Sequence, residues 1–173
     1  KIGLALAQFL RAAGFAARTQ MDMNYQTILP AVAHDAGLGE ISRMGYLLHP
    51  EFGGRIRLGA VTTTAPLPVM GERRFGVQDF CRVCKKCARV CPSGAISHGE
   101  EKEIRGVKKW STNQEACFRF WRTVGTDCAL CMRACPYSKV NSLPHKIIRL
   151  LIRRNPLARR LAVFGDGVFY GKK

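Results

Sequence analysis

The chain has 173 residues, of which 47% are hydrophobic, and a formal net charge of +16, so it can bury one good core, or one core and a small cofactor module. This composition argues against a small disulfide-held scaffold, no apolar run approaches the roughly 18–20 residues of a membrane span, and no signal peptide is visible. The basic excess leaves several partners open: nucleic acid, an anionic membrane surface, an acidic redox partner, an anionic cofactor tail, or solvent alone.

The first residues indicate the middle of a larger fold. The chain begins at Lys1, not at methionine, and we therefore expect a fragment. The segment Ile2 to Ala17 predicts an amphipathic helix with Gly14 as its stop signal. A short strand is expected from Phe15.

A second helix is predicted from Tyr25 to Ala36, with Asn24 as its N-cap and Gly37 after its end. Pro30 then lies within the first turn or two, where proline is least disruptive. The glycine-rich segment from Gly37 to Gly45 predicts a turn that lets backbone approach a ligand closely.

Two strands are expected next. The first is Tyr46 to Pro50, and the second is the alternating segment Arg55 to Val61. A period of two places apolar side chains on one face of the second strand and Arg55 and Arg57 on the other. The segment Thr62 to Pro68 predicts a linker.

All eight cysteines lie in one stretch, from Cys81 to Cys135. It opens with a C-x2-C-x2-C-x3-C-P motif and closes with C-x10-C-x2-C-x3-C-P. A C-x2-C-x2-C loop wraps one face of an iron–sulfur cubane, and the cysteine before the proline normally ligates the other cluster. The spacing therefore predicts two [4Fe–4S] clusters, one held by Cys81, Cys84, Cys87 and Cys135 and the other by Cys91, Cys117, Cys128 and Cys131.

Two other interpretations of the cysteines are weaker. Structural zinc suits a C-x2-C pair, but zinc sites seldom use the triplet spacing or the C-x3-C-P ending. A disulfide framework belongs to short secreted chains with poor cores.

The rest of the chain predicts a charged loop or hairpin and a pair of helices. The charged segment runs from Gly99 to Lys109. The helices run from His145 to Val163 with a break at Pro156, and their basic residues indicate either a solvated face, a membrane surface or a docked partner.

Taken in order, the motifs resemble those of the corrinoid iron–sulfur reductive dehalogenases. The resemblance covers nearly the whole chain and distinguishes it from plain ferredoxins. It rests on Ala36-Gly-Leu-Gly-Glu40 with Arg43 and Gly45, Pro50-Glu-Phe-Gly53, Arg57-Leu-Gly-Ala-Val61, the cysteine motifs from Asp79 to Ala88, Cys91 to Ile96 and Gly125 to Pro136, and Phe169-Tyr-Gly171.

The resemblance implies an α+β fold, namely the C-terminal part of a nitroreductase-like cobamide-binding α/β domain with an inserted ferredoxin-like two-[4Fe–4S] module. Residues 1–65 would then be the C-terminal part of the cobamide-binding domain. Residues 66–143 would form the ferredoxin-like domain, and residues 144–173 a basic helical tail that packs back on the core.

The resemblance also implies reductive cleavage of carbon–halogen bonds at a corrinoid cobalt, with electrons delivered singly through the two clusters. Asn24 and Arg57 match positions that line the family's halide pocket, where a fixed guanidinium stabilises charge on a leaving halide. The family's proton donor would precede Lys1, so the fragment alone is expected to be inactive.

The cobamide is expected to lie against the glycine-rich turn. Its contacts by resemblance are Gly37, Leu38, Gly39, Glu40, Arg43 and Gly45. His34 and His49 are not expected to bind cobalt, because the family binds its cobamide without a lower histidine ligand.

Two rival functions compete with this one. Epoxyqueuosine reductases share the corrinoid and the two clusters and act on tRNA, but the run Glu40-Ile-Ser-Arg43 departs from their Gly-Lys-Asn pattern and no helical repeat follows the clusters. A non-catalytic two-cluster electron carrier would have no use for residues 1–65.

Partners and location follow from the resemblance alone. We expect a small organohalide substrate, a membrane anchor protein, and export to the outer face of the cytoplasmic membrane, as is usual for respiratory members. No nucleic-acid partner is expected.

Overall fold

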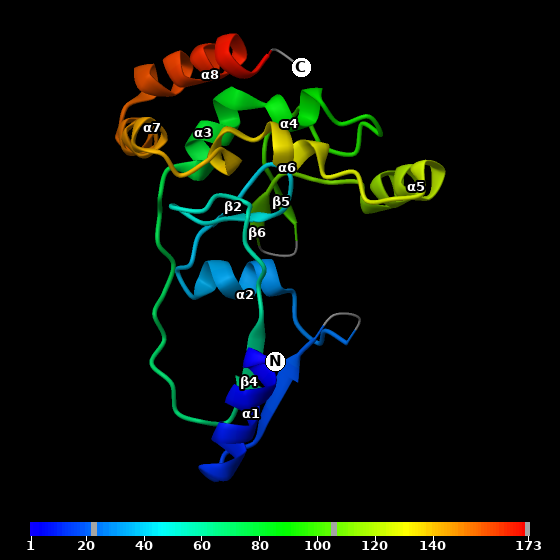
Figure 1. The fold of residues 1–173 in the computed structure, drawn as a ribbon, viewed down its shortest axis with the longest axis vertical. Coiled ribbons are helices and arrows are strands. Elements are labelled where there is room, and N and C mark those ends of the chain that lie inside the picture. The colour runs from blue at the N-terminus through cyan, green and yellow to red at the C-terminus, as the bar shows by residue number, and fades with distance from the viewer. Residues whose placement is uncertain (22–23, 105–106, 172–173) are drawn as a thin grey trace.

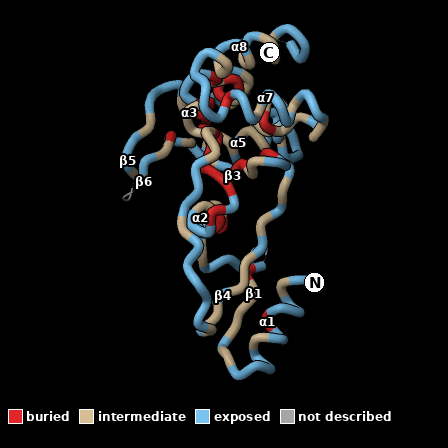
Figure 2. The backbone as a smooth tube through the Cα atoms, turned by 90° about the vertical axis from the view of Figure 1, so that its left-hand side faces the viewer, coloured by how far each residue is buried: buried red, intermediate tan, exposed pale blue. Residues whose placement is uncertain are grey.

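The computed structural model describes residues 1–21, 24–104 and 107–171. The molecule is elongated, with the N-terminal helix and two paired strands at one end and the two C-terminal helices at the other (Figure 1). Most buried residues lie in the half that holds the cysteines, whereas the N-terminal end is largely exposed (Figure 2). The interior that positions the site is therefore built around the cysteine region.

The predicted N-terminal helix and strand are confirmed. Helix α1 spans Ile2–Ala12 and is followed by Gly14, whose φ of 89° is left-handed. Strand β1 (Ala17–Gln20) pairs antiparallel with β4 (Ala60–Thr63), and α1 packs on this ribbon. A Cβ atom on Gly3 would lie 2.7 Å from a methyl carbon of β1, so this glycine lets helix and strand approach closely.

The second helix is shorter than predicted. Helix α2 spans Leu29–Asp35 and its N-cap residue is Ile28, so the prediction that Asn24 caps it is wrong. Pro30 explains the late start, because it lies in the first turn, where a missing N–H costs nothing. A helix beginning at Tyr25 would have placed the ring of Pro30 deeper in the helix, where it clashes with the backbone of the preceding turn.

The glycine-rich segment contains a small hairpin. Strand β2 (Glu40–Ile41) pairs antiparallel with β3 (Leu47–Leu48), so the strand expected from Tyr46 to Pro50 is present in shortened form. Leu48 is fully buried, which anchors the hairpin in the core of the cysteine region.

The strand predicted for Arg55 to Val61 is largely wrong. Of the predicted segment, only the part that belongs to β4 pairs with another strand. Its partner β1 is four residues long, and the pairing ends where Gln20 lies opposite Ala60. The alternation nevertheless persists in the burial, since Arg55 and Arg57 are exposed and the apolar residues between and after them are half-buried. Beyond β4, a long extended segment leads back to the cysteine region (Figure 1).

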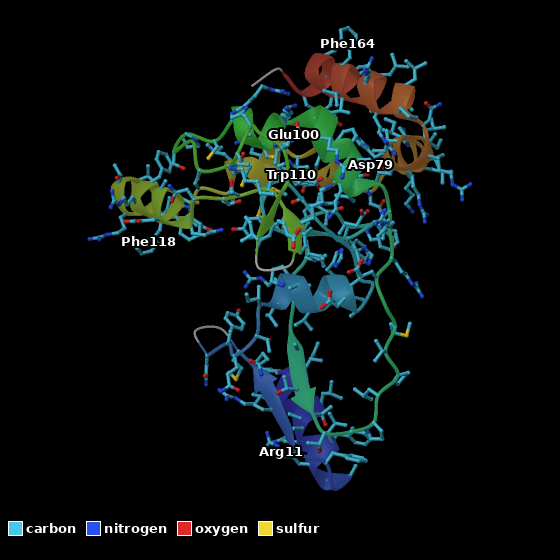
Figure 3. All side chains as sticks on the ribbon, turned by 180° about the vertical axis from the view of Figure 1, so that it is seen from behind. Arg11, Asp79, Glu100, Trp110, Phe118 and Phe164 are labelled. Atoms are coloured by element: carbon cyan, nitrogen blue, oxygen red, sulfur yellow. The ribbon has the colours of Figure 1, made fainter. Side chains whose placement is uncertain are left out.

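The cysteine stretch folds into short helices joined by tight turns. They are α3 (Val77–Cys84), α4 (Lys86–Arg89), α5 (Gln114–Val124), α6 (Leu130–Ala134) and the 3-10 helix η1 (Pro136–Ser138). Strands β5 (Lys102–Ile104) and β6 (Val107–Lys109) form the hairpin expected for the charged segment. Helix α5 projects from the body and carries the exposed Phe118 (Figure 3).

The two predicted C-terminal helices are present, with the break at Pro156. Helix α7 spans Leu143–Arg154 and α8 spans Pro156–Tyr170, and both pack against α3. Ile152 of α7 reaches the same core as Phe80 of α3. Among the described residues, no helix is both long enough and apolar enough to cross a membrane.

Candidate metal centres

The eight cysteines line two separate cavities, four to each, and all are free thiols. The first cysteine cavity is lined by Cys81, Cys84, Cys87 and Cys135. The second cysteine cavity is lined by Cys91, Cys117, Cys128 and Cys131. These are the two groups that the spacing predicts, and each combines cysteines from both motifs. Which thiolates bind iron stays a prediction.

A left-handed residue follows one cysteine in each motif. Lys85 (φ 51°) separates α3 from α4, and Ala129 (φ 46°) precedes α6. In the described part of the chain they are the only non-glycine residues with positive φ, a conformation that costs roughly 1–2 kcal/mol. The turn at Lys85 lets Cys84 and Cys87 line one cavity. Neither a lysine nor an alanine signals such a turn in the sequence.

Burial keeps the thiols of the first cavity protonated when no metal is bound. Burial, followed by the charge of Cys84, raises the pKa of Cys87 and that of Cys135 to about 12. Burial and then Cys135 raise the pKa of Cys81 as well. A metal cluster takes thiolates as ligands, so its assembly here must displace these protons.

Cys91 of the second cavity behaves differently. Burial raises its pKa, but hydrogen bonds from the Ser93 hydroxyl and from backbone N–H groups, including those of Ala95 and Ile96, outweigh burial and lower it. The Cys91 Sγ and Ser93 Oγ atoms are 3.4 Å apart. Gly94, with φ of 61°, lies in the turn whose backbone N–H groups help to lower the pKa of Cys91.

The donor set of both cavities fits iron–sulfur clusters. Four soft sulfur ligands suit iron–sulfur clusters or zinc. Large side chains complete both walls, Phe80 and Met44 in the first cavity and Phe120 and Trp121 in the second. Such walls keep water from cluster sulfurs and so influence the reduction potential.

Arg43, an expected cobamide contact, lies fully buried in the wall of the first cysteine cavity. Its Nε donates to the carbonyl oxygen of Cys81 at 3.2 Å, and its Nη1 donates to those of Ser97 and Gly99 at 2.8 Å each. The guanidinium carbon lies 4.6 Å from the centre of the Trp110 ring. Arg43 thus holds three segments of the cysteine region together.

Glu40, another expected cobamide contact, is also buried inside the chain. Its carboxylate accepts hydrogen bonds from the N–H groups of Phe75 at 2.6 Å and Val77 at 2.9 Å. It therefore fixes the start of α3, the helix that carries Cys81 and Cys84. The cobamide contacts of Glu40 and Arg43 stay predictions.

Packing within the chain explains in part why glycines occupy the positions that are expected to contact the cobamide. A Cβ atom on Gly39 would lie 2.4 Å from the carbonyl oxygen of Leu48. Gly37 and Gly45 have φ of 70° and 81°, and their N–H groups donate to carbonyl oxygens of their own turns. Leu38 is half exposed. Contact of this turn with a cobamide stays a prediction.

The two predicted catalytic residues have different surroundings. Arg57 lines a cavity of about 470 Å³, here called the Arg57 cavity, whose wall also includes Tyr25 and Leu29. Asn24 is not part of this wall, and its amide oxygen accepts a hydrogen bond from Arg18 at 2.8 Å. The catalytic roles of both stay predictions.

Tyr46 and Met132 were not singled out from the sequence, yet both line the second cysteine cavity and the Arg57 cavity. Burial raises the pKa of Tyr46, and Cys131 and Cys117 add to the effect. These two side chains are therefore shared walls of a cysteine site and a ligand-sized cavity. A tyrosine beside a hairpin and a methionine in a cysteine motif are ordinary packing residues, so nothing in the sequence marked them.

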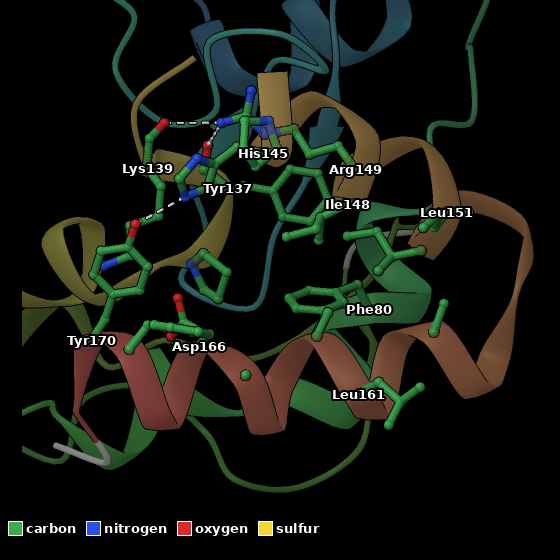
Figure 4. Close-up of a pocket in the computed structure, with 17 residues that line it drawn as sticks. Phe80, Tyr137, Lys139, His145, Ile148, Arg149, Leu151, Leu161, Asp166 and Tyr170 are labelled. Atoms are coloured by element: carbon green, nitrogen blue, oxygen red, sulfur yellow. Dashed lines mark hydrogen bonds between the residues drawn. The ribbon is translucent and has the colours of Figure 1, made fainter. Parts of the chain in front are cut away.

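A fourth cavity, of about 610 Å³, lies between α7, α8 and η1 (Figure 4). Phe80 and Tyr137 line it and also line the first cysteine cavity. Arg149 donates to the carbonyl oxygens of Tyr137 at 3.1 Å and Lys139 at 2.9 Å, which fastens α7 to the segment after Cys135.

A family model described as a 4Fe-4S dicluster domain matches residues 80–139. This interval contains all eight cysteines, which favours iron–sulfur clusters over zinc. A solved epoxyqueuosine reductase with a tRNA stem loop aligns with a TM-score of 0.62 at 22% identity, over 88% of this chain and 40% of that one, and so shows a shared fold alone.

Reductive dehalogenases are more similar. The chain is 37% identical to the tetrachloroethene reductive dehalogenase of Sulfurospirillum multivorans, over 97% of this chain and 35% of that protein. A solved catabolic reductive dehalogenase aligns with a TM-score of 0.90 at 32% identity, over 97% of this chain and 25% of that one. These matches confirm the predicted fold class, and the chain spans about a third of the length of the curated relative. The chain belongs to the reductive dehalogenase family.

Proposed function

We propose that the protein containing this chain is a reductive dehalogenase that replaces the halogen of a small organohalide by hydrogen. The reaction takes up two electrons and one proton and releases a halide ion. A corrinoid, when bound, supplies the cobalt at which the carbon–halogen bond is cleaved. The observation that carries the proposal is the pair of four-cysteine cavities in a chain whose relatives are reductive dehalogenases.

The walls of the cavities suggest how electrons reach the reacting centre. The second cysteine cavity adjoins the Arg57 cavity through Tyr46 and Met132, whereas the first adjoins the cavity beneath α7 and α8. The cluster of the second cavity would then deliver electrons to the reaction, and the cluster of the first cavity would pass electrons to the cluster of the second. We infer this order of electron transfer from the side chains that line two neighbouring cavities at once.

Arg57 is the stronger of the two catalytic candidates. Its guanidinium lines a ligand-sized cavity and carries a permanent charge, which would stabilise negative charge on the departing halide. Asn24 is the weaker candidate, because its amide is already bonded to Arg18. The proton donor and most of the corrinoid site are proposed to lie in the part of the protein that this chain does not cover.

The cellular setting is part of the same proposal. By resemblance to respiratory members, we propose export to the outer face of the cytoplasmic membrane and attachment to a membrane anchor protein. Fractionation of cells that produce the full-length protein tests this, and recovery only in the cytosolic fraction would contradict it.

The decisive experiment is anaerobic reconstitution of the full-length protein with iron, sulfide and a cobamide. About eight iron and one cobalt per chain are expected, together with halide release from an organohalide in the presence of a low-potential one-electron donor. Eight iron without cobalt would leave a two-cluster electron carrier and end the dehalogenase proposal. An Arg57→Gln variant should keep both metals and lose halide release.

A further inference from the structure

Two basic residues are buried in the described part of the chain, Arg43 and Lys86, which are 0% and 5% exposed. Burying a charge is unfavourable unless an opposite charge or a full set of hydrogen bonds compensates it. Lys86 has such a partner, because its ammonium pairs with the carboxylate of Asp166. Arg43 has none.

The partners of Arg43 are neutral. Among the described residues its guanidinium contacts three carbonyl oxygens and the face of Trp110, and it forms no ion pair with a carboxylate. Its Nη2 atom is buried without any hydrogen-bond partner in the same part of the chain. In the described part of the chain, no anion therefore balances the buried positive charge.

The missing anion is indicated by what surrounds Arg43. Arg43 lines the first cysteine cavity and donates to the backbone of Cys81. Four neutral thiols offer no compensation, but a [4Fe–4S] cluster with four thiolates carries a net charge of about −2 and becomes more negative on reduction. A cluster in this cavity would supply the charge that Arg43 lacks.

The second cysteine cavity is different in charge. No lysine or arginine lines it in the described part of the chain, and Asp127 does. The two cavities thus have equal sets of sulfur ligands and unequal electrostatic surroundings, because a buried cation accompanies only the first.

We propose that Arg43 is the buried counter-cation of the cluster in the first cysteine cavity and holds the reduction potential of that cluster above that of the cluster in the second. A nearby cation stabilises the reduced, more negative state more than the oxidised state. Arg43 would accordingly favour reduction of the first cluster before the second. Arg43 acts here through the cluster, as a positioning residue. The inference rests on the proposed function only in requiring both clusters.

The test is a redox titration of the reconstituted full-length protein, followed by electron paramagnetic resonance. Arg43→Gln removes the charge and keeps an amide donor, whereas Arg43→Lys keeps the charge. Arg82→Gln is the matched control, because Arg82 adjoins Cys81 but is 42% exposed and already paired with Asp79 and Glu101. Ser93→Ala, which alters the second cavity, identifies the transition that belongs to the second cluster.

Arg43→Gln is expected to shift the midpoint potential of the first cluster to more negative values and to leave that of the second nearly unchanged. Arg43→Lys and Arg82→Gln should keep both potentials near those of the unaltered protein. Equal shifts of both clusters, or equal shifts in the Gln and Lys variants, would overturn the proposal.

Iron content distinguishes a folding defect from this role. Loss of about four iron in Arg43→Gln, with full iron in Arg43→Lys, would also support a charge requirement. Loss in both variants would contradict it and assign Arg43 to hydrogen bonding alone. These results do not depend on halide release, so failure of the dehalogenase proposal is seen separately, as absent cobalt or absent activity with normal iron.

Discussion

Lys86 of α4 and Asp166 of α8 form an ion pair whose side chains are only 6% and 8% exposed, although the two residues are 80 positions apart in the sequence. The pair joins the last helix of the chain to the helix that carries Cys87. The C-terminal helix is therefore part of the support of the first cysteine cavity.

Asp166→Asn should destabilise the folded protein by about 3–5 kcal/mol, because it leaves the Lys86 ammonium buried without an anion. Denaturant unfolding of the full-length protein, followed by circular dichroism, measures the loss. The double variant Lys86→Met with Asp166→Leu removes both charges and should lose clearly less. A double variant as unstable as the single one would show that the pairing is not the cause.

Ser93→Ala should lower the reduction potential of the cluster in the second cysteine cavity. The hydroxyl hydrogen bond to Cys91 favours the more negative, reduced state, and a differential of about 0.5–1 kcal/mol corresponds to about 20–40 mV for one electron. Redox titration checks the shift, and Ser97→Ala, outside that cavity wall, serves as control. An unchanged potential would show that the backbone donors suffice.

The metal-free protein should become less stable as the pH rises above about 9. The folded state raises the pKa of Cys87 and Cys135 from 9.0 to about 12 through burial, so the unfolded chain releases these protons first. The folded state then binds more protons, and the stability present below pH 9 is lost as the pH approaches 12. Anaerobic urea unfolding at a series of pH values measures this. A Cys87→Ala, Cys135→Ala variant should show a flatter profile.

Glu40→Gln separates a structural role from a cofactor role. The substitution weakens two charge-assisted hydrogen bonds to Phe75 and Val77 and should cost about 1–3 kcal/mol of stability, with unchanged cobalt content in the reconstituted full-length protein. A loss of cobalt at unchanged stability would instead support the contact with a cobamide that resemblance implies.

The sequence predicted the elements whose signals are local. Cysteine spacing foretold which four thiols line each cavity, and Gly14 and Pro156 marked helix ends correctly. The strand expected at Arg55 failed, because strand length depends on a partner, and β1 is short. The position of Tyr46 in two cavity walls also depends on the fold, so the sequence alone does not reveal it.

The sharing of cysteines between the two motifs has a consequence for assembly. The first cavity needs Cys135 from the end of the stretch, and the second needs Cys91 from its beginning. Neither motif encloses a complete site by itself, so a chain cut between β5 and β6 would leave on each piece three cysteines of one site and one cysteine of the other. Both four-cysteine sites are consequently complete only when the two motifs fold against each other.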